Sequence, residues 1–223
     1  MRHPAILIHV VCYNRVESMS DTARNENEKR ESEIFSGAYG FVIRPDEKTQ
    51  ALARELARTT APSAEFLVET PHITLYHAQF ENLPKEVAKS ILDEVKMAEG
   101  QILNLRRLYV FGGKFIFWDV EDKDNIRPIH EKALVSAKYL NHAVAAKSIE
   151  EGLDLNPEEK TNIQKFGYPL VMDKFTPHIT LAYDYQGIVL PPGITEKSLE
   201  MKIDKVLFAE MGKYGSVRRV VDL

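Results

Sequence analysis

The hexapeptide Thr-Pro-His-Ile-Thr-Leu occurs twice in this chain, and it contains the residues best suited to chemistry. The two copies occupy residues 70–75 and 176–181 of the 223-residue sequence. Six consecutive matches so far apart, in a chain without low-complexity bias, indicate two related halves rather than the short-period repeats of a solenoid.

Strand geometry turns this repeat into a candidate active site. Side chains two residues apart on a strand point the same way, so His72 and Thr74 share one face, and His178 and Thr180 share the equivalent face. A neutral imidazole can take a proton from an attacking hydroxyl and a protonated one can give a proton to a leaving oxygen, which contributes about 10²–10⁴-fold to rate. The threonine hydroxyls can donate hydrogen bonds to phosphate oxygens.

This set suits in-line displacement at phosphorus, and no carboxylate cluster that could hold cations accompanies it. We therefore predict a site without metal or cofactor. A lone His-x-Thr is common in strands and carries little weight, but two identical copies after Thr-Pro favour a functional site. A zinc site is the rival, and we expect His77 to be excluded as a third ligand because strict alternation puts it on the opposite face from His72.

Two further residues are candidates for flanking the substrate. Tyr76 has the strand parity of His72, so it either stacks on a base or packs at the end of the strand. Lys174 lies four residues before His178 and either reaches a phosphate or is a solvated loop lysine.

The rest of the pattern predicts an α+β fold with helices that cover sheet faces. We expect strands at 38–43, 72–80, 102–110, 115–120, 178–183, 202–209 and 217–221, and helices from Pro45–Asp46, from Pro84 to Gly100, over about 125–146 and near 157–165. Gly112-Gly113 predicts a hairpin between two of these strands, and Trp118 is expected in the core.

The paired motif resembles the 2H phosphoesterase superfamily, which includes bacterial 2′-5′ RNA ligase-like proteins and cyclic phosphodiesterases. The segments FGGKFIFWDV (111–120) and FTPHITLA (175–182) are also similar to that family, and the resemblance covers roughly residues 36–223. It implies a bilobal, pseudo-symmetric fold in which two antiparallel sheets flank a central groove with helices on the outer faces. It also implies that the two histidines act as acid and base and that Thr74 and Thr180 bind the phosphate.

These observations predict a metal-independent phosphodiesterase that hydrolyses a 2′,3′-cyclic phosphate or a related nucleotide or RNA phosphodiester. The alternatives are a 2′-5′ RNA ligase that runs the reverse reaction and a non-catalytic RNA- or nucleotide-binding module, although a pure binder has no need of two imidazoles. We expect a poorly ordered extension at 1–34 and a single domain at 35–223 with an added segment at about 147–170, because the polar stretch before residue 34 lacks apolar residues to bury.

Amino-acid composition limits which binding partners and which cellular compartment we expect for this protein. The 29 basic and 33 acidic residues give a net charge of −4, which argues against non-specific binding of duplex nucleic acid. A single cysteine excludes an intramolecular disulfide and fits a reducing compartment. No stretch has the length and apolarity of a membrane span, and the apolar run at 4–12 lacks a clear cleavage site. We therefore expect a cytoplasmic protein with a nucleotide or RNA-end substrate and no membrane association.

Overall fold

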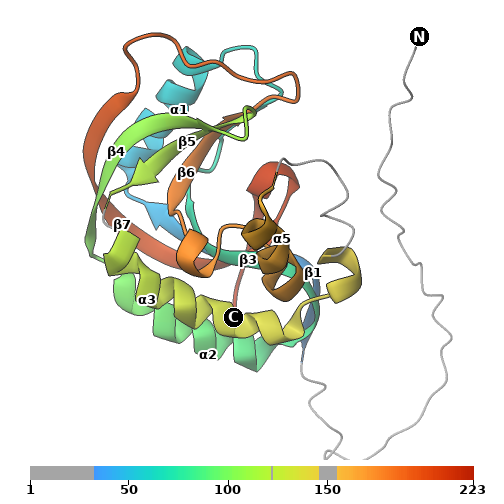
Figure 1. The fold of residues 1–223 in the computed structure, drawn as a ribbon. Coiled ribbons are helices and arrows are strands. Elements are labelled where there is room, and N and C mark those ends of the chain that lie inside the picture. The colour runs from blue at the N-terminus through green and yellow to red at the C-terminus, as the bar shows by residue number, and fades with distance from the viewer. Residues whose placement is uncertain (1–32, 122, 146–154) are drawn as a thin grey trace, which may run out of the picture. The chain divides into compact units, whose positions relative to one another are not determined.

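The computed structural model describes residues 33–121, 123–145 and 155–223, and its described part is built around an antiparallel sheet (Figure 1). Residues Ser32–Leu223 form one compact unit. The expected extension at 1–34 and the first half of the expected added segment, up to residue 154, lie almost entirely outside the described residues.

The elements follow the order strand, helix, strands, helix, hairpin, helices, strands. The strands are β1 (Ile34–Pro45), β2 (Phe66–Leu67), β3 (Ile73–Pro84), β4 (Ile102–Phe111), β5 (Phe115–Val120), β6 (His178–Tyr183), β7 (Glu196–Met211) and β8 (Val217–Val221). Among the described residues, α-helices are α1 (Glu47–Thr60), α2 (Lys85–Val95), α3 (Lys123–Leu134) and α5 (Pro157–Phe166), with a further helical turn at 142–145. Short 3₁₀ turns are η1 (Lys96–Ala98), η2 (Val135–Tyr139), η3 (Met172–Lys174) and η4 (Lys213–Gly215).

The strands of the described residues join in one eight-stranded sheet rather than in two separate ones. Their order is β1-β3-β6-β5-β4-β7-β8, with β2 paired to β6. Because β1 also pairs with β7, hydrogen bonding closes a circuit through β1, β3, β6, β5, β4 and β7. The link between β3 and β6 is a single residue pair, so the sheet is weakly joined at the point where the two hexapeptides meet.

Local sequence signals explain where the helices begin. Asp46 caps α1 by accepting hydrogen bonds from the backbone and hydroxyl of Thr49, at 3.0 and 2.9 Å. It also accepts from the backbone of Lys202 at 2.8 Å, which ties the start of α1 to β7. Pro84 precedes α2, as expected, since its fixed φ suits a helix start and it needs no donor there.

The long helix expected over about 125–146 is interrupted rather than continuous, and α-helix returns only at residues 142–145. The helix α3 ends at Leu134, and after the η2 turn Leu140 takes an extended conformation. Leu140 is buried and forms an isolated β-bridge with Phe80, while the backbone of Asn141 donates to Gln79. Contacts with the end of β3 therefore override the helical spacing of the apolar residues.

The helices pack against the strands that carry the two hexapeptides. Figure 1 shows α2 and α3 side by side, and both pack against β3, whereas α1 packs against β2 and β6. Trp118 of β5 is fully buried, as expected, and its indole donates to the carbonyl of Lys197 at 2.8 Å. None of the helices in the described residues is long and apolar enough to span a membrane.

Candidate active site

The two hexapeptides lead into β3 and β6, where the histidines and threonines gather on one face. The isoleucines that separate His from Thr in the two motifs pair with each other in antiparallel register. In such a pair, the residues beside one member face those beside the other. His72 therefore lies opposite Thr180, and Thr74 lies opposite His178. Because each histidine meets the threonine of the other half, the four side chains form one set.

Backbone carbonyls fix the orientation of both imidazoles. Nδ1 of His72 lies 2.8 Å from the carbonyl oxygen of Thr70, and Nδ1 of His178 lies 2.6 Å from that of Thr176. Since a carbonyl oxygen only accepts, Nδ1 carries the proton and donates it in each ring. Nε2 is then the nitrogen that can exchange a proton with a ligand.

The two Nε2 atoms differ in their contacts. Nε2 of His72 lies 3.0 Å from the carbonyl oxygen of Gly215 in η4, so both nitrogens of this ring face acceptors, which favours the doubly protonated form. Nε2 of His178 has no hydrogen-bond partner among the residues that the structure describes. The ring of His178 stacks instead on Phe117, with centroids 3.5 Å apart and planes 18° from parallel.

Burial governs the protonation of these rings. Burial, followed by the charges of nearby His72 and His77, lowers the pKa of His178 to about 4, although its bond to Thr176 opposes the shift. Burial also lowers the pKa of His72 from its ordinary 6.5, against the bonds to Thr70 and Gly215 that raise it. His178 is therefore neutral at neutral pH and able to accept a proton at Nε2.

The two threonines are available to a ligand. Both Thr74 and Thr180 are half-buried on the face that carries the histidines. Neither hydroxyl forms a hydrogen bond within the described part of the chain. Each can therefore donate to an anionic oxygen placed between the two strands.

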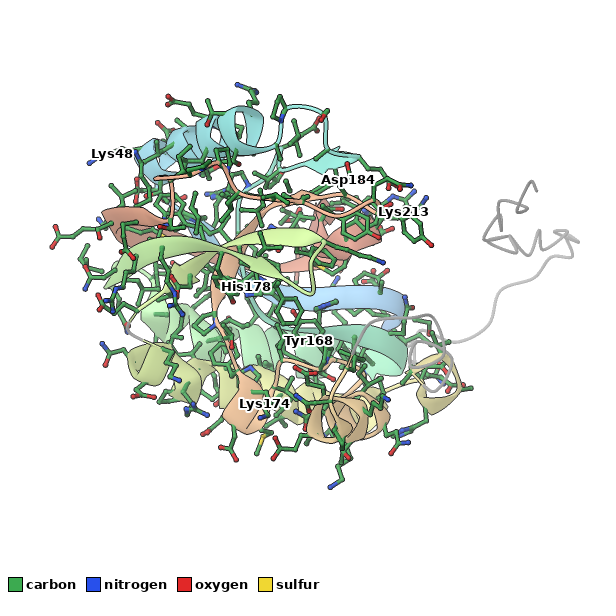
Figure 2. The ribbon with its side chains drawn as sticks, turned by 45° about the horizontal axis from the view of Figure 1, so that its top comes forward. Lys48, Tyr168, Lys174, His178, Asp184 and Lys213 are labelled. Atoms are coloured by element: carbon green, nitrogen blue, oxygen red, sulfur yellow. The ribbon has the colours of Figure 1, made fainter. Side chains whose placement is uncertain are left out.

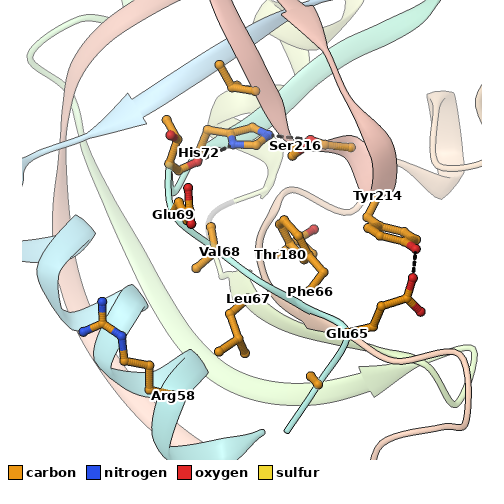
Figure 3. Close-up of a pocket in the computed structure, with 14 residues that line it drawn as sticks. Arg58, Glu65, Phe66, Leu67, Val68, Glu69, His72, Thr180, Tyr214 and Ser216 are labelled. Carbon is orange, nitrogen blue, oxygen red and sulfur yellow. Dashed lines mark hydrogen bonds between the residues drawn. The ribbon is translucent and has the colours of Figure 1, made fainter. Parts of the chain in front are cut away.

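A cavity of about 580 Å³ adjoins His72 and Thr180 (Figure 3). This volume is within the usual range for small-molecule sites. Its walls come from α1, from the segment around β2 and from η4 with the start of β8, and they carry the aromatic rings of Phe66 and Tyr214. The ring of Tyr214 stacks on Tyr183 at 4.2 Å.

A β-bulge at the last residue of each hexapeptide changes the face on which the later side chains of that strand lie. Between β1 and β3 the register skips Leu75, and between β5 and β6 it skips Leu181. These are the last residues of the two repeats, so the halves share this irregularity. A bulge inserts one unpaired residue and shifts every later side chain by one position.

The first bulge brings His77 to the face of the other histidines, which overturns the alternation argument that excluded it. The charge of His77 contributes to the lowered pKa of His178, and that of His72 contributes to the lowered pKa of His77. The ring of His77 also contacts Tyr168, with centroids 4.4 Å apart. Sequence reasoning missed this residue because a bulge has no signal of its own in an apolar strand.

The same bulge removes Tyr76 from the face of His72, so the expectation that Tyr76 flanks the substrate is wrong. Tyr76 is fully buried and donates its hydroxyl to the carbonyl of Phe166 at 2.6 Å. Of the two interpretations, packing in the strand is the correct one.

Lys174 does not line the cavity. Its ammonium group forms an ion pair with Glu158 of α5 at 2.6 Å, which raises its pKa. In the view of Figure 2 it lies below Tyr168 and His178. The ammonium group of Lys174 is therefore paired with a neighbouring carboxylate.

Gly40 of β1 lies opposite His77, and we predict that Gly40→Ala damages both the fold and the site. A Cβ there would lie 2.6 Å from Cβ of His77 and 2.9 Å from the carbonyl oxygen of Tyr76. Strands β1 and β3 would have to separate beside the bulge, at a cost of roughly 1–3 kcal/mol. We expect thermal denaturation to show a melting temperature several degrees lower, whereas Ser90→Ala on the exposed face of α2 should leave it unchanged. A melting temperature within one degree of wild type would contradict this packing.

The histidine cluster does not have the geometry of a metal centre. Within the described residues, no group of three or more His, Cys, Asp or Glu side chains is arranged to hold an ion. The residues brought together are imidazoles, hydroxyls and aromatic rings.

Fold and site together define a mixed α/β protein whose antiparallel sheet presents two His-x-Thr motifs on one face. Residues 130–187, which include the second hexapeptide, match a family described as "Protein of unknown function (DUF1045)". Among solved structures the chain is similar to the crystal structure of TT0787 from Thermus thermophilus, with a TM-score of 0.52 and 16% sequence identity over 83% of this chain and 95% of that one. That likeness shows the fold alone. No curated protein matches the chain significantly.

Proposed function

We propose that this protein is a metal-independent phosphodiesterase of the 2H phosphoesterase type. The observation that carries the proposal is the crossed pairing of two identical motifs, in which each histidine lies beside the threonine of the other half. The repeated hexapeptides, the repeated Nδ1-to-carbonyl bonds and the repeated bulges support the idea that the two halves correspond to the two lobes of that family.

The contacts of the two rings favour different roles. His178 is the general base, because its Nε2 has no protein partner in the described residues and its low pKa keeps it neutral. His72 is the general acid, because both of its nitrogens face carbonyl acceptors that stabilise the imidazolium. An anionic phosphate bound between the rings raises the pKa of His72 and keeps that proton in place.

The reaction then balances without a further reactant. Nε2 of His178 takes a proton from water as the water oxygen bonds to phosphorus. The ester P–O bond on the opposite side breaks, and the leaving oxygen takes the proton from Nε2 of His72 in place of the contact with Gly215. The net result is the addition of one water across the ester bond, and proton exchange with solvent restores both rings.

The threonines stabilise the charge that develops during this step. The hydroxyls of Thr74 and Thr180 donate to the non-bridging oxygens of the phosphate from the two strands. A 2′,3′-cyclic phosphate is the simplest substrate, opened to a phosphomonoester. Assaying purified protein for hydrolysis of 2′,3′-cyclic nucleotides tests the proposal directly. Binding without turnover would favour the binding-module alternative, and joining of RNA ends would favour the ligase.

Removal of metal ions should leave the activity unchanged. The imidazoles supply both proton transfers and the hydroxyls bind the charged oxygens, so no step requires a cation. We expect the same rate of 2′,3′-cyclic nucleotide hydrolysis with and without EDTA, measured after dialysis against the chelator. Loss of activity in EDTA and its recovery on addition of zinc or manganese would assign the protein to metal-assisted hydrolysis instead.

A further inference from the structure

We infer that His130 of α3 is a positioning residue that joins the two halves of the site and sets the distance between His178 and Thr74. The inference rests on the proposed function for its catalytic consequence, and it gives a role to a histidine outside both hexapeptides. The sheet joins the two motif strands, β3 and β6, through a single residue pair. Any further connection between the halves therefore contributes strongly to the alignment of the four side chains.

His130 is fully buried and contacts both halves. Its Nδ1 lies 2.6 Å from the carbonyl oxygen of Leu75, the bulged residue that directly follows Thr74. Its Nε2 accepts a hydrogen bond from the backbone N–H of Met172 at 3.2 Å, in the η3 turn that leads to the second hexapeptide. The ring also stacks on Phe175, which directly precedes that hexapeptide, with centroids 3.9 Å apart and planes 11° from parallel.

These two hydrogen bonds define the protonation state of the ring. A carbonyl oxygen only accepts and a backbone N–H only donates, so Nδ1 of His130 carries the proton and Nε2 does not. A second proton would face the N–H of Met172 and break that bond. Burial lowers the pKa of His130, which favours the same neutral ring. His130 is therefore a fixed bridge rather than a third acid or base.

The second half of the repeat shows what this bridge replaces. The carbonyl of Leu181, the equivalent of Leu75, accepts a hydrogen bond directly from the backbone N–H of Val68 at 2.9 Å. Val68 lies two residues before the first hexapeptide and belongs to the segment that leads into it. In the same segment, Phe66–Leu67 pairs with β6 as strand β2. On this side of the site, backbone therefore meets backbone.

On the other side, the ring of His130 lies between the corresponding segments. Lys174 is the equivalent of Val68, but its backbone N–H donates to Val171 within the turn. The connection between the bulged carbonyl of β3 and the backbone of η3 passes through the imidazole instead. The two sides of the site therefore differ by the width of an imidazole ring.

This bridge affects catalysis because its two ends adjoin one crossed pair of the site. One end holds the carbonyl of Leu75, which directly follows Thr74 in β3. The other end holds Phe175, next to Thr176, whose carbonyl accepts a hydrogen bond from Nδ1 of His178. Movement of either end separates the base from a hydroxyl that binds the phosphate. A misplacement of about 1 Å can lower a rate by about 10²-fold.

The test separates the hydrogen-bonded bridge from the space that the ring fills. His130→Phe keeps a stacking ring but removes the donor and the acceptor, whereas His130→Gln keeps one of each on an amide. On a 2′,3′-cyclic nucleotide, we expect His130→Phe to lower kcat by about 10–10²-fold and to change KM by less than about threefold. His130→Gln should retain at least about a third of the wild-type kcat, because it restores both hydrogen bonds.

Ile126→Ala is the matched control for loss of stability. Ile126 is buried on the same helix, and the cavity left by alanine should lower the melting temperature while kcat stays within about twofold of wild type. If His130→Phe does not fold, His130→Asn takes its place, because its amide is one methylene shorter and cannot reach both partners. A wild-type kcat in the variant without the bridge, or equal losses of kcat in that variant, His130→Gln and Ile126→Ala, would overturn the inference.

Nuclear magnetic resonance separates failure of this inference from failure of the proposed function. In the free protein, the ring of His178 should titrate closer to its ordinary pKa of 6.5 in His130→Phe than in wild type, because a displaced ring is less buried. His130→Gln should restore the wild-type titration. If the cyclic nucleotide is hydrolysed but kcat and the titration of His178 are the same in wild type and His130→Phe, the inference alone fails. If wild-type protein hydrolyses no cyclic nucleotide, the proposed function fails, and the titration still decides whether His130 positions His178.

Discussion

Replacing either histidine of the repeat with alanine should lower kcat by several orders of magnitude. Each imidazole performs a separate proton transfer, and each transfer contributes about 10²–10⁴-fold. The double variant His72→Ala/His178→Ala should be little worse than either single variant, because groups that act as a unit are not additive. Thr74→Val should cost less, up to about 10²–10³-fold, since it removes one neutral donor. Steady-state hydrolysis of a 2′,3′-cyclic nucleotide measures all four variants.

His142→Ala is the matched control for these variants. His142 is exposed, and its ring Nδ1 lies 3.3 Å from the carbonyl oxygen of Gln164, away from the two hexapeptides. It should keep the wild-type rate, and thermal denaturation should show that all variants fold. A His72→Ala or His178→Ala protein with wild-type kcat would exclude the acid–base pair and leave the binding-module alternative.

The rate should follow a bell-shaped dependence on pH, with an optimum for kcat/KM that is more acidic than neutrality. The base must be neutral, so kcat/KM falls as the pH drops through the pKa of His178, which burial lowers to about 4. The acid must be protonated, so kcat/KM falls as the pH rises through the pKa of His72, which burial lowers from 6.5. Below the pKa of His178 and above the pKa of His72, we expect kcat/KM to fall about tenfold per pH unit.

The profile of kcat should lie at higher pH than that of kcat/KM. The former reports the enzyme–substrate complex and the latter the free enzyme. A bound phosphate anion raises the pKa of both imidazoles, which moves the whole window toward neutrality. Lys174→Gln should not change either profile, because that cation is paired with Glu158. Rates that stay flat from pH 5 to 9 would contradict the assignment.

The contact between His72 and Gly215 connects these predictions to the C-terminal hairpin of β7 and β8. The carbonyl of Gly215 accepts a hydrogen bond from Nε2 of His72, whose proton must be transferred to the leaving oxygen. Substrate binding therefore has to replace this hydrogen bond with one to the ester oxygen. The residue beside it, Tyr214, has a positive φ of 58°, a conformation that side chains rarely adopt, so this turn is held in place by its contacts with Tyr183 and Glu65.

Much of the architecture followed from local signals in the sequence. The strands around the hexapeptides, the hairpin at Gly112-Gly113, the helix starts at Asp46 and Pro84 and the burial of Trp118 all depend on neighbouring residues, and the structure has each of them. The interruption of the helix before Leu140 could not be predicted from local signals, because it depends on a β-bridge between Leu140 and Phe80 in a distant strand. The closed hydrogen-bonded circuit, in place of two separate sheets, depends on the pairing of β1 with both β3 and β7.

The sequence by itself determined which residue types stand in the two motifs and that they occur in two related halves. Strand alternation held within each hexapeptide, so it placed His72 with Thr74 and His178 with Thr180. It failed one residue later, because the bulges at Leu75 and Leu181 arise from pairing with β1 and β5, which lie far away in the chain. Only the tertiary structure could bury Tyr76, bring His77 to Tyr168, stack Phe117 on His178 and set Gly215 against His72, since each of these contacts joins residues from different strands or turns.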